Sequence, residues 1–598
     1  MPAVPLELVL SGGDVTDARV RPGGQWVSAV ESVTDTTGSR NILRMWHVAT
    51  GRCVNLLADP EPAAGRGLSG GAHAWHPEGG ALAVVVRSGG VAVVSVDTDT
   101  VRAVEMLPFD ATRSWSTPQF TSDGRELHLV ADWSEVHGLD TETLETWVFH
   151  DASDFAMDPA GVAGGASLVW NRPEMSWTTS RIQPHAVRVG VSVQQPRRNR
   201  EGRLAGWIDD ENGWWNVVVT RDDGTIVRIE EPHEHAGPVW GPGQRTWCPS
   251  PDGTMVALAR NDDGFGSLWV RDINGNDARQ VARGIHGCLS WEANVLAAVR
   301  SGARTPQQLV AYDVSDLDSP ARTILCTPAD ARWMTEHDAD LVEPTTQTAR
   351  VADGTNVPFR VYAPPSPHGG LIVWVHGGPI DQWQVTFRPR LTTWVSRGWT
   401  VAVPDHRGTT GHGRAFREAL HGCWGDIDVT DTLAVVHEMQ VRGFTPDTTV
   451  VMGGSAGGLT ALGVAAREPD SVAGIVVSYP VVDLAEMLRH DDPFEGHYIP
   501  TLLGTSDPND AHLVMRSPLA GAGSLARVPI LAFHGDNDHS VPLVHSERLR
   551  DAVAGAGGDV ELVVFAGEGH GFKLRESLVR EFETTEAFLN GVLSRRRG

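Results

Sequence analysis

The sequence predicts two domains, an all-β propeller of about seven blades followed by a doubly wound, mostly parallel α/β sheet. Its 598 residues exceed what one hydrophobic core organises, so a chain of this length divides into several domains. A turn-and-strand plan recurs through residues 13–335, and strands alternate with helical patterns from about residue 341. We therefore place the propeller at residues 1–340 and the C-terminal domain at residues 341–598.

The N-terminal repeat is a turn rich in Pro, Asp or Gly followed by a short apolar strand. Four copies begin at Arg21, His76, Thr121 and Ser250. Several copies continue into a second strand-like run, which suits four-stranded blades of roughly 40 to 50 residues. About 320 residues divided by that period give six to eight blades, and we choose seven. The tryptophans of this half are interpreted as packing residues between blades.

In the C-terminal half, apolar strands of four to six residues alternate with helical patterns. Strands that alternate with helices form a parallel sheet, because the crossover helices cover its faces. The strands are expected at residues 371–375, 400–403, 448–452, 474–477, 530–533 and 561–564.

A nucleophile elbow is predicted at residues 448–462. A β-branched run leads into Gly453-Gly454-Ser455-Ala456-Gly457 and a helical pattern follows, so strand, sharp turn and helix succeed one another. The glycines allow the strand and helix to pack closely, and the strained turn presents Ser455 Oγ as the candidate nucleophile. A second G-x-S-x-G around Ser69 has neither strand nor helix beside it and is interpreted as a surface loop.

A serine nucleophile needs a base and a group that orients the base. Asp538 follows one predicted strand, and His570 lies between glycines after the next. The order Ser455, Asp538, His570 is that of an α/β-hydrolase domain. His534 and Asp536 are the rivals for these roles. His534 precedes the acid loop and would break the order, so both rivals are interpreted as buried polar residues.

Donors for the oxyanion that forms on attack are expected from two loops. His376-Gly377-Gly378-Pro379 follows a predicted strand, and backbone N–H groups in such a loop can point at the oxyanion. The N–H of the residue after the nucleophile points at it as well. We assign the oxyanion hole to Gly378 and Ala456.

Together these segments resemble the prolyl oligopeptidase family of serine peptidases, most closely its acylaminoacyl-peptidase and dipeptidyl-aminopeptidase-like branch, across nearly the whole chain. Further support comes from residues 405–414 (DHRGTTGHGR) and 424–428 (WGDID). The resemblance implies a β-propeller that caps an α/β-hydrolase domain, with the active site in the cavity between them. It also implies access for short peptides only, and hydrolysis through an acyl-enzyme without a cofactor.

Two positions depart from the pattern of that family. His406 stands where a Tyr is common, and Ser540 stands where many members carry an Arg or Asn that holds a substrate carbonyl. A serine is short and neutral, so it should hold the peptide backbone less strongly than an Arg. We hypothesise that the apolar side chain at the scissile residue supplies more of the binding energy, with Phe494 and Tyr498 in its pocket. The alternative for both aromatic residues is core packing.

Composition narrows the class of protein. The net charge of −26 disfavours nucleic acid and anionic membranes as partners, because phosphate repels so acidic a chain. The sequence opens without a basic segment followed by an apolar one, and no apolar run approaches about 18 residues, so a cytoplasmic protein is predicted. Five scattered cysteines indicate neither disulfides nor zinc. His233-Glu234-His235 lacks an evident third ligand and is interpreted as surface, so no metal is expected.

The leading hypothesis is a cytoplasmic serine peptidase that acts on short peptides and releases N-terminal acyl-aminoacyl, aminoacyl or dipeptidyl units without a cofactor. A carboxylesterase or small-molecule amide hydrolase with the same triad is the main alternative. A propeller-based binding protein with an inactive hydrolase is the third, and the intact triad opposes it. Glu230-Glu231 could bind a free substrate ammonium or be an exposed strand end. The preferred scissile residue, the state of the peptide N-terminus and the oligomeric state, including a homo-oligomer, stay open.

Overall fold

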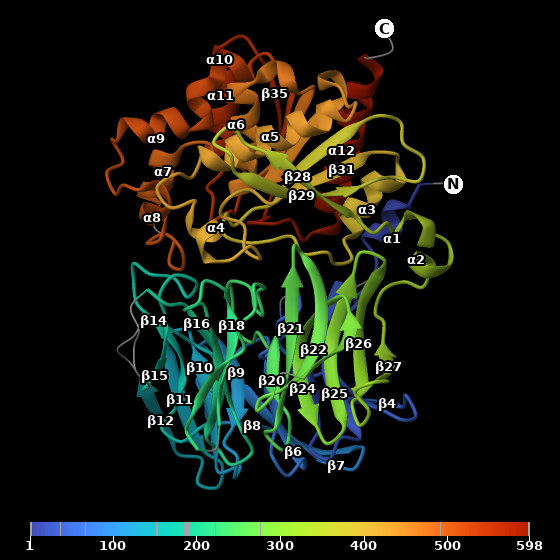
Figure 1. Ribbon diagram of the computed structural model, residues 1–598, viewed down its shortest axis with the longest axis vertical. Helices are drawn as coiled ribbons and strands as arrows, with labels where there is room; N and C mark the ends of the chain where they lie inside the picture. The colour runs from blue at the N-terminus through green and yellow to red at the C-terminus, as the bar shows by residue number, and fades with distance from the viewer. Residues whose placement is uncertain are drawn as a thin grey trace. The chain divides into compact units, whose positions relative to one another are not determined.

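The computed structural model describes residues 3–35, 38–65, 67–150, 154–184, 190–221, 223–275, 277–490 and 492–595. The chain divides into two compact units. The propeller unit consists of Ser11–Ala331 and Gln384–Phe387, and the α/β unit consists of Met1–Leu10, Arg332–Trp383 and Arg388–Gly598. Strands build the propeller unit, whereas helices flank one sheet in the α/β unit (Figure 1).

Seven antiparallel sheets make up the described part of the propeller unit, which confirms the predicted number of blades. Six sheets have four strands, the fourth has three, and the strands of each sheet are neighbours in chain order. The first four sheets contain β1 Val15–Val20, β2 Trp26–Asp35, β3 Gly38–His47, β4 Cys53–Leu57; β5 His73–Trp75, β6 Ala81–Val85, β7 Val91–Asp97, β8 Thr100–Met106; β9 Trp115–Phe120, β10 Glu126–Ala131, β11 Glu135–Asp140, β12 Thr146–His150; and β13 Phe155–Met157, β14 Ser167–Trp170, β15 Arg181–Gln183. The last three contain β16 Val193–Arg198, β17 Leu204–Asp209, β18 Asn216–Thr220, β19 Ile226–Arg228; β20 Trp247–Pro249, β21 Met255–Asp262, β22 Phe265–Asp272, β23 Ala278–Arg283; and β24 Ile285–Glu292, β25 Val295–Gly302, β26 Thr305–Asp313, β27 Ala321–Cys326.

The repeated turn explains why the N-terminal pattern folds as hairpins. In each of the four copies, a glycine donates its N–H to the carbonyl of the residue three positions earlier. These glycines have φ between 71° and 77°, a conformation that a residue with a Cβ adopts at a cost. They are Gly24, Gly79, Gly124 and Gly253.

Tryptophans pack between neighbouring sheets, as predicted. Trp26 from the first sheet and Trp75 from the second share one hydrophobic cluster, and Trp115 joins the second sheet to the third. All three are buried. Because each sheet of a propeller covers only its neighbours, these clusters replace the single core of a globular domain.

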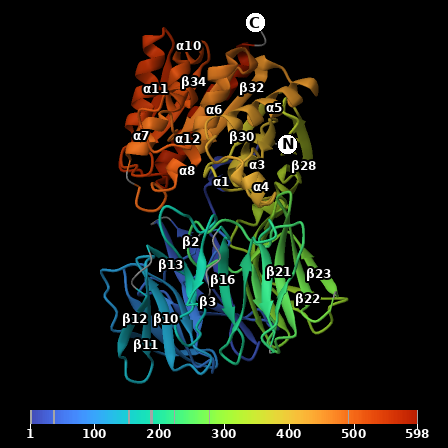
Figure 2. The same cartoon turned by 60° about the vertical axis from the view of Figure 1, so that its left-hand side comes forward.

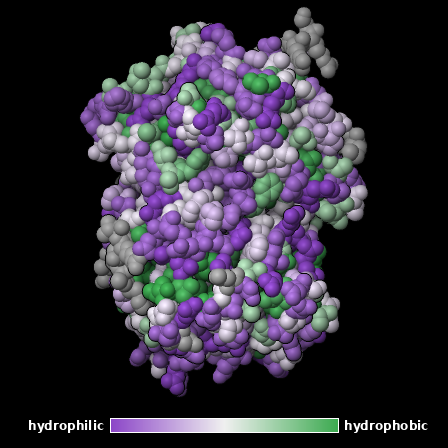
Figure 3. Space-filling view, viewed as in Figure 1, coloured by the Kyte–Doolittle hydropathy of each residue, from purple (hydrophilic) through white to green (hydrophobic). Residues whose placement is uncertain are grey.

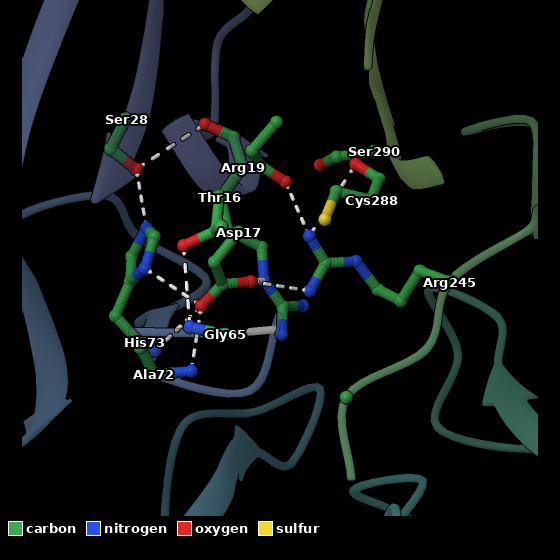
Figure 4. A network of polar contacts seen from close by, with 12 residues as sticks. Thr16, Asp17, Arg19, Ser28, Gly65, Ala72, His73, Arg245, Cys288 and Ser290 are labelled. Atoms are coloured by element: carbon green, nitrogen blue, oxygen red, sulfur yellow. Dashed lines mark hydrogen bonds and ion pairs between the residues drawn. The ribbon is translucent and has the colours of Figure 1, made fainter. Parts of the chain in front are cut away.

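A buried ion-pair network ties distant parts of the propeller ring together (Figure 4). Asp17 of β1 accepts hydrogen bonds from the backbone N–H groups of Ala72 and His73 at 2.8 and 2.9 Å. It also pairs with Arg245 Nη1 at 2.7 Å, while Arg245 Nη2 donates to the Cys288 carbonyl of β24. Burial would raise the pKa of the Asp17 carboxyl, but His73 and Arg245, with help from Arg19, hold it well below its usual value.

Replacement of Arg245 by methionine is expected to lower the free energy of unfolding of the propeller unit by about 3 kcal/mol, because it removes the arginine that lies nearest to the buried Asp17 carboxylate. Urea denaturation of the full chain at pH 7 measures this effect. The control is Arg279→Met, which breaks an exposed ion pair with Asp318 and should cost under about 1 kcal/mol.

The pH dependence of that loss follows from the sign of the Asp17 shift. A carboxyl whose folded-state pKa is depressed stabilises the fold above its unfolded pKa, and this contribution disappears as the pH falls through the folded value. The difference between the parent and Arg245→Met should therefore be constant from about pH 8 to 5 and narrow below about pH 4. A difference that grows on acidification would contradict the assigned role of Asp17.

One eight-stranded sheet organises the α/β unit, in the order β28-β29-β31-β30-β32-β33-β34-β35. The pairs from β31-β30 to β34-β35 are parallel, and β28-β29 and β29-β31 are antiparallel, which confirms a mostly parallel sheet. Each predicted strand lies within two residues of an observed one. The strands are β28 Thr345–Arg350, β29 Asn356–Tyr362, β30 Leu371–Val375, β31 Thr400–Pro404, β32 Thr449–Gly454, β33 Gly474–Ser478, β34 Ile530–Gly535 and β35 Val560–Phe565.

Helices cover both faces of this sheet (Figure 2). One hydrophobic cluster joins strand residues such as Val451 and Ile475 to α5, α6 and α11, whereas Phe588 of α12 packs against Gly474 on the other face. The helices are α1 Leu6–Val9, α2 Arg332–Thr335, α3 Pro389–Ser396, α4 Arg414–Glu418, α5 Ile427–Val441, α6 Ala456–Arg467, α7 Leu484–Arg489, α8 Ile499–Leu503, α9 Ala511–Arg516, α10 Ala522–Leu525, α11 Val544–Gly555 and α12 Arg575–Arg595. No helix in the described ranges is long and apolar enough to span a bilayer, and the face in Figure 3 is largely hydrophilic.

Candidate active site

Ser455 occupies the turn between β32 and α6, at the carboxyl end of a central parallel strand. Its φ of 56° and ψ of −125° are unusual for a residue with a Cβ. The Ser455 N–H donates to the Ser478 carbonyl at 3.1 Å, and the Ser455 carbonyl accepts from the Gly458 N–H at 3.0 Å. These backbone bonds maintain a strained turn of the kind that exposes a nucleophile.

The glycines around Ser455 are required by close packing. A Cβ on Gly453 would lie 2.2 Å from the Gly457 carbonyl oxygen, and one on Gly457 would lie 2.5 Å from the His376 carbonyl oxygen. Backbone atoms cannot yield to such contacts. The G-x-S-x-G spacing here is therefore a consequence of how the strand, the helix and the His376 loop meet, whereas Ser69 lies in a propeller loop.

Asp538 and His570 are brought together by the loops after β34 and β35. Asp538 Oδ2 accepts a hydrogen bond from His570 Nδ1 at 2.8 Å, and Oδ1 accepts from the N–H groups of Ser540 and Val541. Burial would raise the pKa of Asp538, but the hydrogen bond and charge of His570 hold it below its usual value. The bond to Nδ1 leaves His570 Nε2 as the nitrogen that can accept a proton.

The rival residues shape the same loops. His534 is fully buried and bonds Ser546 Oγ at 2.7 Å and the Val541 carbonyl at 2.9 Å. Asp536 accepts the Gly567 N–H at 2.6 Å and is exposed, so its interpretation as a buried residue is wrong. An exposed carboxylate can hold the neighbouring loop because one strong bond to a backbone N–H suffices.

Tyr479 is a site residue that the sequence analysis missed. It follows β33 directly, with φ of 41°, and its ring lies 4.5 Å from the His570 ring, centroid to centroid. A Cβ on Gly454 would lie 3.2 Å from Tyr479 Cε2. The tyrosine thus contacts both the residue before Ser455 and the His570 ring. Its place at the carboxyl end of a parallel strand was the available sequence indication.

The predicted oxyanion loop packs beside the nucleophile turn. A Cβ on Gly377 would lie 3.6 Å from Ser455 Cβ, and Gly378 has φ of 123°. His376 Nδ1 donates to the Gly377 carbonyl and Nε2 accepts from Thr409 Oγ1, both at 2.7 Å. Burial lowers the pKa of His376 to about 3, so this ring is neutral and serves to support the loop.

The segments at 405–414 and 424–428, which resemble those of the prolyl oligopeptidase family, make contacts that support these loops. Asp405 makes a bidentate pair with Arg360 at 2.7 and 2.6 Å and also accepts from Gln382, three residues after Pro379. Asp428 accepts from Thr460 Oγ1 at 2.6 Å, which ties α5 to α6. His406, the position that departs from the family pattern, stacks on His376 with ring centroids 4.7 Å apart.

Of the predicted substrate-binding residues, Ser540 contacts Asp538 through its backbone N–H. His490 Nε2 donates to the carbonyl of His539, the residue after Asp538, at 2.6 Å, and the segment with Phe494 and Tyr498 follows. Tyr498 is buried with its hydroxyl bonded to His421 Nε2 at 2.8 Å, while Phe494 is half-buried. The roles of these aromatic residues and of Ser540 in substrate binding stay predictions.

The structure changes the interpretation of two acidic segments of the propeller, Glu230-Glu231 and His233-Glu234-His235. Glu231 pairs with His235, Arg260 and Arg271. The hydrogen bonds and charges of these partners outweigh burial and lower the pKa of Glu231 to about 2, so its negative charge is already compensated. Glu230 is exposed. Glu234 and His235 are buried, so their interpretation as surface is wrong. The carboxylate of Glu234 accepts a hydrogen bond from the backbone N–H of Trp215 at 2.6 Å, which explains why Glu234 can be buried.

Comparisons with known proteins match the C-terminal part of the chain to a peptidase family. Residues 385–596 match the Prolyl oligopeptidase family, Peptidase_S9. Curated relatives include dipeptidyl aminopeptidase BIII of Pseudoxanthomonas mexicana, 30% identical over 38% of this chain and 34% of the relative. The acylamino-acid-releasing enzyme of Homo sapiens is 26% identical over 37% of this chain and 30% of the relative. The chain therefore matches about a third of the length of these two relatives, 34% and 30%.

Solved structures match nearly the whole chain. A puromycin hydrolase is 25% identical with a TM-score of 0.81, covering 98% of this chain and 96% of that one. The acylaminoacyl peptidase of Pyrococcus horikoshii is 15% identical with a TM-score of 0.70, covering 97% and 95%. At this lower identity the likeness shows the fold alone.

Proposed function

We propose that this chain, whose C-terminal part is a prolyl oligopeptidase family domain, is a serine peptidase that hydrolyses short peptides and releases N-terminal units. The observation that carries the proposal is the His570–Asp538 hydrogen bond of 2.8 Å beside Tyr479, which in turn lies against the strained Ser455 turn. The named peptidases among the relatives support the same activity.

In the proposed mechanism, Ser455 Oγ attacks the peptide carbonyl carbon while His570 Nε2 accepts the hydroxyl proton. Asp538 keeps the proton on Nδ1 and stabilises the imidazolium that forms. The N–H groups of Gly378 and Ala456 would donate to the oxyanion. The intermediate then collapses as His570 protonates the leaving amine, and water repeats the sequence on the acyl-enzyme.

A small-molecule aminoacyl amide is the second candidate substrate, favoured by the likeness to a puromycin hydrolase. Fluorophosphonate labelling of Ser455 tests for any serine hydrolase. Rates on aminoacyl and acyl-aminoacyl p-nitroanilides, puromycin and p-nitrophenyl esters then separate the candidates. Faster hydrolysis of the anilides than of the esters, together with hydrolysis of dipeptides, supports the peptidase. Hydrolysis of the esters alone would overturn it.

Phe494→Ala is expected to lower kcat/KM about tenfold or more for substrates with a bulky apolar scissile residue and much less for alanine, because the lost ring would have packed on that side chain. Matched Phe and Ala anilides measure this. Met515→Ala, which removes an exposed side chain of α9, is the control. Equal losses on both substrates, or losses that follow the melting temperature, would make Phe494 a packing residue.

A further inference from the structure

The propeller unit contains an axial cavity of about 530 Å³, within the size range of small-molecule sites. The first strand of each of the seven sheets, or the residues just after it, lines this cavity. All of its lining residues belong to the propeller unit. The proposed peptidase mechanism uses none of them.

Arginines dominate the charged lining of the cavity. Arg200 pairs with Glu292, and Arg245 is occupied by Asp17, so these two are already compensated. The charged residues of the lining are Arg19, Arg197, Arg198, Arg200, Arg245, Asp158 and Glu292. The lining thus carries an excess of positive charge, although the chain as a whole has a net charge of −26. The composition of the chain does not account for a basic cavity.

Arg19 is the cation of the lining whose guanidinium has unused hydrogen-bond donors. Its Nε donates to Asp17 Oδ1 at 3.3 Å, whereas its two terminal nitrogens have no hydrogen-bond acceptor among the described residues. Burial together with repulsion by Arg245 and Arg197 lowers the pKa of Arg19 to about 9, despite the attraction of Asp17. A partly buried guanidinium with open donors beside other cations is a site for an oxyanion.

Asp158 lines the same cavity and carries a carboxylate oxygen that lacks a hydrogen-bond donor among the described residues. Its Oδ1 accepts the Gly243 N–H at 2.7 Å, but its buried Oδ2 has no hydrogen-bond donor in the described part of the chain. The residue is 3% exposed, and burial raises the pKa of its carboxyl in spite of the nearby arginines. A buried acceptor without a donor is costly, so a ligand that donates to Asp158 would be stabilised there.

We propose that the axial cavity binds a small zwitterion, an amino acid or short peptide, with its carboxylate on Arg19 and its ammonium on Asp158. The two unsatisfied groups have opposite charge and line one cavity, so a ligand that carries both charges satisfies both. A simple anion such as phosphate would satisfy Arg19 but face the Asp158 carboxylate. This inference stands on the propeller residues and does not depend on the proposed peptidase activity.

Isothermal titration of the full-length Ser455→Ala chain with alanine, N-acetylalanine, alaninamide and phosphate tests the proposal. Without the nucleophile, alaninamide, which is itself an aminoacyl amide, is not hydrolysed during the measurement. Alanine should bind about tenfold or more tightly than either derivative, since each derivative lacks one charge-assisted bond. Arg19→Met and Asp158→Asn should each weaken alanine binding about tenfold, while Arg279→Met, on an exposed ion pair, should leave it unchanged.

Asp158→Asn separates the zwitterion from a plain anion, because it removes the negative charge and keeps an acceptor for Gly243. It should weaken alanine binding while leaving phosphate binding equal or stronger. Phosphate binding tighter than alanine, equal affinity for alanine and N-acetylalanine, or alanine binding unchanged in Asp158→Asn would overturn the proposal. If Arg19→Met fails to fold, Arg19→Lys, which retains the charge, takes its place and should weaken binding less than about tenfold.

Discussion

Ser455→Ala is expected to lower kcat/KM by several powers of ten without loss of the folded state. The nucleophile attacks through Oγ, and nothing else in the mechanism can replace it. The turn itself depends on backbone bonds to Ser478 and Gly458 and on the tight contacts of Gly453 and Gly457, none of which involves the hydroxyl. Steady-state rates and the melting temperature measure the two effects separately.

Ser69→Ala is the matched control for that substitution, because Ser69 stands in the other G-x-S-x-G of the chain but in a propeller loop. It should leave kcat/KM unchanged. Residual activity of Ser455→Ala within about tenfold of the parent would remove Ser455 as nucleophile. A lowered melting temperature with proportionate loss of activity would instead show that the turn, not the chemistry, had changed.

Asp538→Asn is expected to lower kcat by about 10⁴-fold, as the equivalent change does in other serine triads. The carboxylate accepts from His570 Nδ1, whereas an amide can turn its NH₂ toward the ring and donate. That exchange puts the proton of the neutral ring on Nε2, where it blocks transfer from Ser455. The other contacts of Asp538, from Ser540 and Val541, need only an acceptor and survive in asparagine.

Asp536→Asn provides the comparison, because Asp536 lies two residues away and contacts the Gly567 N–H in the same pair of loops. Asparagine keeps an acceptor for that N–H, so kcat should change by less than about tenfold. Should the two substitutions exchange their effects, Asp536 and not Asp538 would be the acid.

Much of the fold could be predicted because its patterns are local. The propeller repeat appears as a turn glycine with positive φ followed by a strand, and the parallel sheet appears as apolar runs whose bounds fall within two residues of those observed. The Ser455 turn belongs to this group in part, since Gly453 is required by its contact with the adjoining helix, whereas Gly457 is required by the distant His376 carbonyl. Apart from that last contact, each of these features depends on neighbours in sequence.

Other features depend on residues far apart in the chain. Tyr479 belongs to no recognisable motif, yet its ring lies against that of His570, which is 91 positions later in the sequence. Glu234 and His235 look like surface in a polar run, but partners at Trp215 and Glu231 allow their burial. In these cases the sequence shows a polar or aromatic residue and not the group that will satisfy it.

The sequence by itself determined the two-part architecture, the Ser455 turn and the chain order of the candidate triad, because turn chemistry, strand periodicity and order are written locally. Only the tertiary structure decided that His570 meets Asp538 rather than Asp536, that arginines compensate the charge of Glu231, and that Arg19 and Asp158 line one cavity. The physical reason is that hydrogen bonds and ion pairs act over a few ångströms in space, whichever positions the fold brings together.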